Sequence, residues 1–190
     1  LEEKGISVIT DANSPLLAGA NVIIRAHGVS KDILQTLQDS GCRIVDATCP
    51  FVRKIQILAE EQYKKGHTVI IVGDPKHPEV AGINGYCENR AVILPDLEAA
   101  VRFSEEESAR NGVPADTGFY SVVAQTTFNK IKFTEIADFL KKSIDKVFIF
   151  DTICNATSLR QKETMRIAAE TDLTVVIGGR QSSNTKRLFE

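Results

Sequence analysis

Residues 46–79 have the sequence DATCPFVRKIQILAEEQYKKGHTVIIVGDPKHPE, and residues 151–184 repeat its pattern. With an offset of 105 residues and no gap, Asp46 falls on Asp151, Cys49 on Cys154 and Gly73 on Gly178. Each stretch predicts a strand end, an Asp-x-x-Cys turn, a helix, a second strand, a glycine and a polar loop. Because strands that alternate with helices are typical of parallel sheets, this stretch predicts an α/β fold.

The same alternation continues along the rest of the chain. We predict strands at Ile6–Ile9, Val22–Arg25, Arg43–Val45, Thr68–Val72, Ala91–Leu94, Phe119–Ala124, Lys146–Phe150 and Leu173–Ile177. We predict helices at Ser30–Gln38, Pro50–Lys65, Asp96–Glu107, Asn129–Lys142 and Ser158–Glu170, and one that begins near Ser182. Ser30 and Asn129 precede periodic apolar runs, as N-cap residues do.

A second internal match, with an offset of 99 residues, links residues 22–30 to residues 121–129. It places His27 on Thr126 and Ser30 on Asn129. Three related units would form small, mostly parallel sheets in a pseudo-threefold arrangement. The alternative is a generic match, since parallel α/β units share sequence patterns.

The two matches together divide the chain into three segments. These are the second half of unit one at 1–48, a complete central α/β unit at 49–150, and the first half of unit three at 151–190. We therefore expect a further cysteine before Leu1 and a continuation after Glu190, so that the chain is part of a longer protein.

The composition excludes several classes of function. The net charge of −2 provides no basic surface for a nucleic acid or an anionic membrane. No apolar run approaches the ~20 residues of a membrane span, and no signal peptide precedes the first strand. Apolar residues make up 43% of the chain and charged residues 25%, which is ordinary for a globular protein. We expect a cytoplasmic protein with reduced cysteines.

The four cysteines fall into two groups. Cys42 and Cys87 have no motif around them, and a small buried thiol explains them. Cys49 and Cys154 occupy equivalent positions at a strand end, each followed by a helix whose N-terminus stabilises a thiolate. One cysteine from each of three units would leave one iron of a [4Fe–4S] cluster open as a Lewis acid.

Polar residues also follow the predicted strands, where ligands bind in parallel α/β proteins. His27 and His77 are candidate donors to phosphate oxygens. Ser182, Ser183 and Asn184 begin a helix and either bind phosphate or act only as N-caps. Glu79 is a candidate proton donor, and Thr126 is placed to orient that proton.

These motifs together resemble the 4-hydroxy-3-methylbut-2-enyl diphosphate reductase (LytB) family. The matching segments, in family order, are Arg25–Ser30, Asp46–Pro50, His77–Val80, Gln125–Thr127, Asp151–Thr157 with Arg160 and Gln161, and Ser182–Asn184. They span nearly the whole chain. Each segment alone is a weak signal, and the ordered set is highly specific.

The resemblance implies the last step of the methylerythritol phosphate (non-mevalonate) route to isoprenoids. An iron–sulfur reductase would cleave the allylic C–O bond of this small diphosphate, giving isopentenyl and dimethylallyl diphosphate. Ferredoxin or flavodoxin would donate the electrons. By motif match, Cys49 and Cys154 would hold the cluster. His27, His77, Thr126, Ser182, Ser183 and Asn184 would bind the substrate, and Glu79 with Thr126 would deliver the proton.

The first cluster cysteine, a diphosphate-binding histidine and a later serine of the family are not in this sequence. We therefore expect the chain by itself to be inactive. Two alternatives stay open. One is a non-redox α/β enzyme that acts on a phosphate ester, with structural cysteines. The other is a diphosphate-binding module that has lost catalysis.

Overall fold

The structure, a computed structural model, describes residues 2–9, 11–110, 118–180 and 182–189, so Leu1 and Glu190 at the outer segment boundaries lie outside it. The strands form two parallel sheets, one in the order β1-β2 and one in the order β4-β3-β5-β6. The strands are β1 (Asn21–Ile24), β2 (Arg43–Asp46), β3 (Thr68–Val72), β4 (Val92–Leu94), β5 (Tyr120–Ala124) and β6 (Val147–Ile149). The predicted α/β class with small parallel sheets is confirmed.

The described part of the chain has seven α-helices, of which α1 to α5 connect the strands and α6 and α7 follow β6. They are α1 (Lys31–Asp39), α2 (Pro50–Lys64), α3 (Pro78–Gly85), α4 (Leu97–Arg110), α5 (Lys130–Ser143), α6 (Asn155–Glu170) and α7 (Ser183–Phe189). Both predicted caps are confirmed: Ser30 Oγ accepts the Ile33 N–H at 3.4 Å, and Asn129 Oδ1 accepts the Lys132 N–H at 3.0 Å. None of the helices described is long and apolar enough to cross a bilayer.

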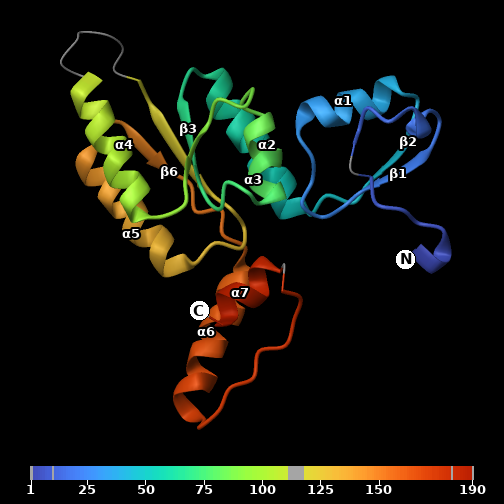
Figure 1. The fold of residues 1–190 in the computed structure, drawn as a ribbon. Helices are drawn as coiled ribbons and strands as arrows, with labels where there is room; N and C mark the ends of the chain where they lie inside the picture. Colours follow the sequence, from blue (N-terminus) through green and yellow to red (C-terminus); the bar gives the residue numbers. More distant parts are fainter. Residues whose placement is uncertain (1, 10, 111–117, 181, 190) are drawn as a thin grey trace.

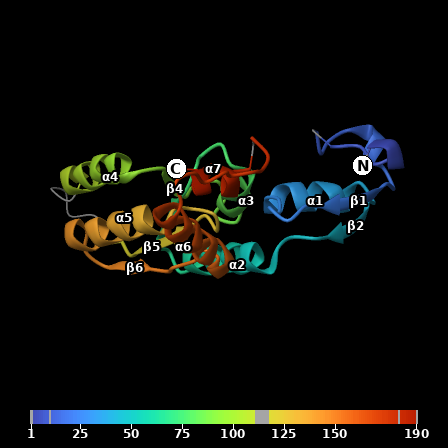
Figure 2. The same cartoon turned by 90° about the horizontal axis from the view of Figure 1, so that it is seen from below.

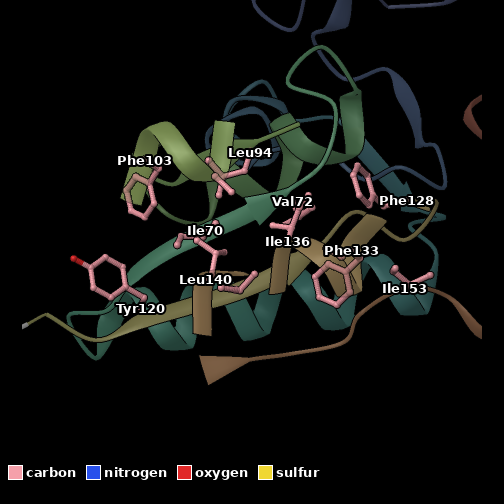
Figure 3. Close-up of a cluster of buried hydrophobic side chains, with 13 residues drawn as sticks. Ile70, Val72, Leu94, Phe103, Tyr120, Phe128, Phe133, Ile136, Leu140 and Ile153 are labelled. Atoms are coloured by element: carbon pink, nitrogen blue, oxygen red, sulfur yellow. The ribbon is translucent and has the colours of Figure 1, made fainter. Parts of the chain in front are cut away.

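The four-stranded sheet is covered by helices on both faces (Figure 1). On one face α4 and α5 pack against β3 and β5, and Phe103, Phe133, Ile136 and Leu140 belong to the same buried cluster as Ile70 (Figure 3). On the other face α2 and α3 contribute Ile55, Ala59, Val80 and Ile83 to a second core. Because both faces are buried, β3 and β5 are apolar in sequence rather than alternating.

The β1-β2 sheet and α1 form a smaller unit at one end of an elongated molecule, with α4 and α5 at the other end (Figure 2). Its core is small, built on Leu17, Val22 and Leu37. It joins the central unit where α3 meets the start of α1. A Cβ atom at Gly85 would lie 2.2 Å from Ser30 Cβ, so this junction requires a residue without a side chain.

The two parallel strand pairs have the same register. Val22 lies opposite Ile44 in the first pair, as Val122 lies opposite Ile149 in the second. The N–H of each strand-end cysteine bonds a carbonyl of the neighbouring strand's loop at 3.0 Å, Cys49 to Ala26 and Cys154 to Thr126. Ala26, rather than the predicted His27, is therefore the counterpart of Thr126. The loop that follows is one residue shorter before Asn129 than before Ser30.

Two predicted strands are wrong. Residues 6–9 and 173–177 form no strand, and Leu173, Val175 and Ile177 are exposed. The central counterpart of residues 173–177 is β3, which has a strand on each side, whereas no strand lies beside 173–177 in the described residues. A single strand has no neighbour to pair with its backbone N–H and C=O groups, so a strand-like sequence alone does not form a strand.

The helices differ from the prediction by more than one residue in three places. α4 ends at Arg110 rather than at Glu107. α6 begins at Asn155, directly after Cys154, rather than at Ser158. α3 was not predicted, because Gly82 and Gly85 weaken a helical pattern. Its start nevertheless has a recognisable signal, since Pro78 occupies the first turn and His77 caps it.

Candidate functional site

Six of the residues predicted to act in the site lie at the carboxyl end of a strand or in the helix that follows. His27 follows β1, Cys49 follows β2, and His77 and Glu79 follow β3. Thr126 follows β5 and Cys154 follows β6, whereas Ser183 and Asn184 begin α7 and Ser182 directly precedes it. Parallel pairing directs these strand ends to one edge of each sheet, and contacts between the loops join the two sheets there.

Glu79 and Thr126 form a closed pair. The Thr126 N–H donates to Glu79 Oε1 at 2.6 Å, and the Thr126 hydroxyl donates to Oε2 at 2.7 Å. The glutamate is 1% exposed. Burial raises its pKa, and the two bonds from Thr126 oppose that rise without cancelling it. Glu79 therefore holds a proton at a higher pH than an ordinary carboxyl group does, as a general acid requires.

The two candidate histidines face each other across the junction between the units. Their ring centroids are 5.3 Å apart in an edge-on arrangement. His77 Nδ1 accepts the Glu79 N–H at 3.2 Å, so the proton of the neutral His77 ring lies on Nε2. His27 Nδ1 is buried without a hydrogen-bond partner among the described residues, which is uncommon for a polar atom outside a binding site.

Burial lowers the pKa of both rings. The charge of Arg25 lowers the pKa of His27 further. At His77 the charge of His27 is the next largest effect, and Arg25 and Arg187 act in the same direction, against Asp74. Burial and nearby positive charges thus favour the neutral form of both rings. A bound anion would favour the protonated form.

The start of α7 contacts the loop after β5 through Ser183. The Thr127 hydroxyl donates to Ser183 Oγ at 3.0 Å, and Ser182 Oγ accepts the Thr185 N–H at 3.3 Å. Asn184 Oδ1 accepts the Thr157 hydroxyl at 3.5 Å. Ser182 therefore acts as an N-cap, whereas Ser183 faces the loop that carries Thr126.

Gln125 is a central polar residue that was not predicted to act in the site, although it lies in a matching motif. It is 1% exposed. Its Oε1 accepts the Asp74 N–H at 3.0 Å, and its Nε2 donates to Thr127 Oγ1 at 2.8 Å and Ser183 Oγ at 3.4 Å. A buried amide with both ends satisfied joins the loops after β3 and β5 to α7. Its position before two threonines was the available signal.

The four cysteines are free thiols with different surroundings. Cys87 is fully buried, and burial raises its pKa to about 12, so it is inert. Cys42 donates to the Leu17 carbonyl at 3.0 Å. Cys49 and Cys154 are half-buried and stand at the caps of α2 and α6 without bonding the helix through sulfur. Cys49 and Cys154 thus differ in surroundings from Cys42, whose thiol is hydrogen-bonded, and from Cys87, which is fully buried.

Cys49 and Cys154 meet part of what an iron–sulfur cluster needs. Two thiols at helix N-termini, left free by the caps, fit two ligands of such a cluster. Within residues 2–9, 11–110, 118–180 and 182–189, no group of three metal-ligating side chains comes together. The described residues therefore fit part of such a site, which would need a further ligand from outside them.

Sequence comparison finds proteins similar to this chain that are named as reductases. A protein of Caldanaerobacter subterraneus called 4-hydroxy-3-methylbut-2-enyl diphosphate reductase is 42% identical over 189 residues, 99% of this chain and 62% of its own length. One of the same name from Clostridioides difficile is 41% identical over 100% of this chain and 64% of its length. The chain thus spans less than two thirds of these relatives.

Two solved structures that are similar to this chain are also described as reductases. The E-1-hydroxy-2-methyl-but-2-enyl-4-diphosphate reductase of Plasmodium falciparum superposes with a TM-score of 0.85 at 27% identity, over 98% of this chain and 56% of that one. A second structure is described as (E)-4-hydroxy-3-methyl-but-2-enyl diphosphate reductase, the terminal enzyme of the non-mevalonate pathway. It matches with a TM-score of 0.64 at 34% identity, over 89% and 57% of the two chains. The family profile described as LytB protein matches residues 1–190, and the chain belongs to the LytB protein family.

Proposed function

We propose that the protein containing this chain reduces 4-hydroxy-3-methylbut-2-enyl diphosphate to isopentenyl and dimethylallyl diphosphate. In this reaction two electrons and two protons replace a C–OH bond by a C–H bond and release water. The names of the relatives support this substrate. The electron donor would be a ferredoxin or a flavodoxin, and the reaction would take place in the cytoplasm.

Cys49 and Cys154 would hold two irons of a [4Fe–4S] cluster, with a third thiolate supplied from outside the described residues. When bound, such a cluster supplies the electrons and acts as a Lewis acid toward the hydroxyl group. The N-termini of α2 and α6 stabilise the negative charge of the two thiolates.

The diphosphate would lie against His27 and His77, with Ser183 and Asn184 on its other side and Ser182 fixing the start of α7. The two imidazoles, kept neutral by burial, take up protons as the anion binds, because its charge favours the imidazolium form. Binding at this end leaves the hydroxyl end of the substrate for Glu79 and Thr126.

The single observation that carries the proposal is the Glu79–Thr126 pair. A carboxyl group with a raised pKa is held at both oxygens beside the histidine pair. Glu79 protonates the departing hydroxyl so that it leaves as water, and Thr126 keeps the carboxyl oriented. A diphosphate-binding module without catalysis has no need for this pair.

The test is iron and labile-sulfide analysis of the complete gene product, purified without oxygen, followed by turnover with the diphosphate and reduced ferredoxin. We expect about four irons and four sulfides per protein, together with both isomeric products. A protein without iron would reject the cluster and favour the alternative, a non-redox enzyme acting on a phosphate ester.

A further inference from the structure

Two glutamines without an assigned role occupy equivalent positions in the repeat. Gln56 and Gln161 coincide when Cys49 is placed on Cys154, and each lies about two helical turns after its cysteine. Gln56 is fully buried on α2, and Gln161 is half-buried on α6. A polar side chain retained at the same buried position of two units calls for a common partner.

That partner is the same in both units. Gln56 Nε2 donates to the Val29 carbonyl at 3.3 Å, and Gln161 Nε2 donates to the Phe128 carbonyl at 3.4 Å. Val29 and Phe128 each directly precede the residue that caps the next helix, Ser30 or Asn129. In both units, therefore, a glutamine on the helix that follows the cysteine donates to a carbonyl in the loop after the neighbouring strand.

The other end of each amide is also satisfied. Gln56 Oε1 accepts from Arg53 Nη1 at 3.2 Å, and Gln161 Oε1 accepts the Lys130 N–H at 3.5 Å. These partners fix which end of each amide faces the carbonyl, since an oxygen there could not donate.

The loops held in this way carry different groups. The first loop contains His27 beside Gly28. Gly28 has a φ of +67°, and a Cβ atom added to it would lie 2.6 Å from Gln56 Nε2, so this position has no room for a side chain. The second contains Thr126, which holds Glu79. One glutamine therefore adjoins the candidate anion site and the other adjoins the candidate proton source.

We infer that Gln56 and Gln161 are symmetry-related positioning residues. Gln56 sets His27, and Gln161 sets Thr126, relative to the cysteine that begins the same helix. The functional part of this inference rests on the proposed function, and the structural part does not. Gln56 thus governs binding of the diphosphate, and Gln161 governs turnover.

The experiment uses three Gln-to-Met variants of the complete gene product. Gln56→Met and Gln161→Met keep the side-chain length and remove the donor. Gln62→Met is the matched control, because Gln62 is a buried glutamine on the same helix α2 but bonds Ser121, near the opposite end of β5 from Thr126. Hydrogen exchange, pyrophosphate affinity, KM and kcat are measured for each.

Hydrogen exchange tests the positions directly and needs no activity. Gln56→Met should speed exchange at Gly28, whose N–H bonds the Arg25 carbonyl, and leave Phe128 unchanged. Gln161→Met should do the reverse. An exchange pattern equal to that of Gln62→Met at both loops would overturn the inference. If Gln56→Met does not fold, hydrogen exchange in the Gln161→Met variant, at a half-buried position, tests the inference by the same criterion.

Activity then separates positioning from general destabilisation. We expect Gln56→Met to weaken pyrophosphate binding and raise KM about tenfold, with kcat within about twofold, as the loss of one hydrogen bond predicts. Gln161→Met should lower kcat about tenfold and keep pyrophosphate affinity. Equal losses in both variants and in Gln62→Met would overturn the assignment. An inactive wild type would reject the proposed function and leave the exchange result standing.

Discussion

At the scale of single residues, Glu79 shows how a sequence motif and a structure contribute different information. The motif around His77 placed a carboxylate after a strand, which is where a proton donor belongs. The sequence does not show that Thr126, far along the chain, holds both of its oxygens at 2.6 and 2.7 Å. Its burial depends on the packing of two strands and was not predictable from residues 77–79 alone.

The raised pKa of Glu79 predicts a dependence of stability on pH. Because burial favours its protonated form, the folded state loses stability as pH rises above the ordinary carboxyl value of 4.5 and through the higher folded-state pKa. The amide introduced by Glu79→Gln stays neutral and fits, since the Thr126 hydroxyl can accept from its NH₂ group. We expect the variant to gain in unfolding free energy relative to wild type as pH rises from about 4 to about 8, measured by urea denaturation. A constant difference across that range would contradict the assignment.

Thr126 and Thr127 are neighbours whose hydroxyls serve different partners, Glu79 and Ser183. Thr126→Val removes one of the two bonds that orient the acid, so we expect kcat to fall about tenfold with little change in pyrophosphate affinity. Thr127→Val should weaken pyrophosphate binding more than it lowers kcat. Calorimetry and steady-state kinetics on the pair check this, and identical profiles for the two variants would refute the division of roles.

At the scale of elements, local pattern predicted every strand that has a neighbour. β3 and β5 are buried on both faces, and their apolar β-branched sequences identify them. Residues 173–177 have the same pattern and form no strand, because strand formation depends on a partner that the described residues do not supply. Helix α3 was missed for the opposite reason, since its glycines weaken the helical pattern and Gly85 is required by packing against Ser30.

Gly82 and Gly85 allow that reason to be tested on one helix. An added Cβ at Gly82 meets nothing closer than 3.4 Å, whereas one at Gly85 would lie 2.9 Å from the Ser30 backbone. We expect Gly85→Ala to lower the free energy of unfolding by about 1–3 kcal/mol through overpacking. Gly82→Ala should be neutral or gain up to about 1 kcal/mol from helix propensity. Chemical denaturation compares the two, and equal effects would show that α3 and α1 are not tightly joined.

At the scale of the whole molecule, the repeat explains why distant residues form one site. We propose that residues 1–48, 49–150 and 151–190 are the second half of one unit, a complete unit and the first half of a third. The matching registers of β1-β2 and β5-β6 support this division. The predicted match of residues 22–30 to residues 121–129 is wrong by one residue before the loop, because a match without gaps cannot place a single-residue deletion within a loop.

This division predicts a difference between the chain and the complete gene product. The described residues include Cys49 and Cys154, the two proposed cluster ligands, and no group of three possible metal ligands. We therefore expect the 190-residue chain, reconstituted with iron and sulfide without oxygen, to retain far less iron after gel filtration than the complete protein does. Equal iron contents would show that two cysteines suffice.

The most direct measurement for the whole account is turnover of 4-hydroxy-3-methylbut-2-enyl diphosphate by the complete gene product and its Glu79→Gln variant, with iron content and pyrophosphate affinity measured on the same samples. The account predicts that wild type forms isopentenyl and dimethylallyl diphosphate. It predicts that the variant loses about a hundredfold or more in kcat, as removal of a general acid does, with iron and affinity retained. Equal turnover by the two proteins would contradict it.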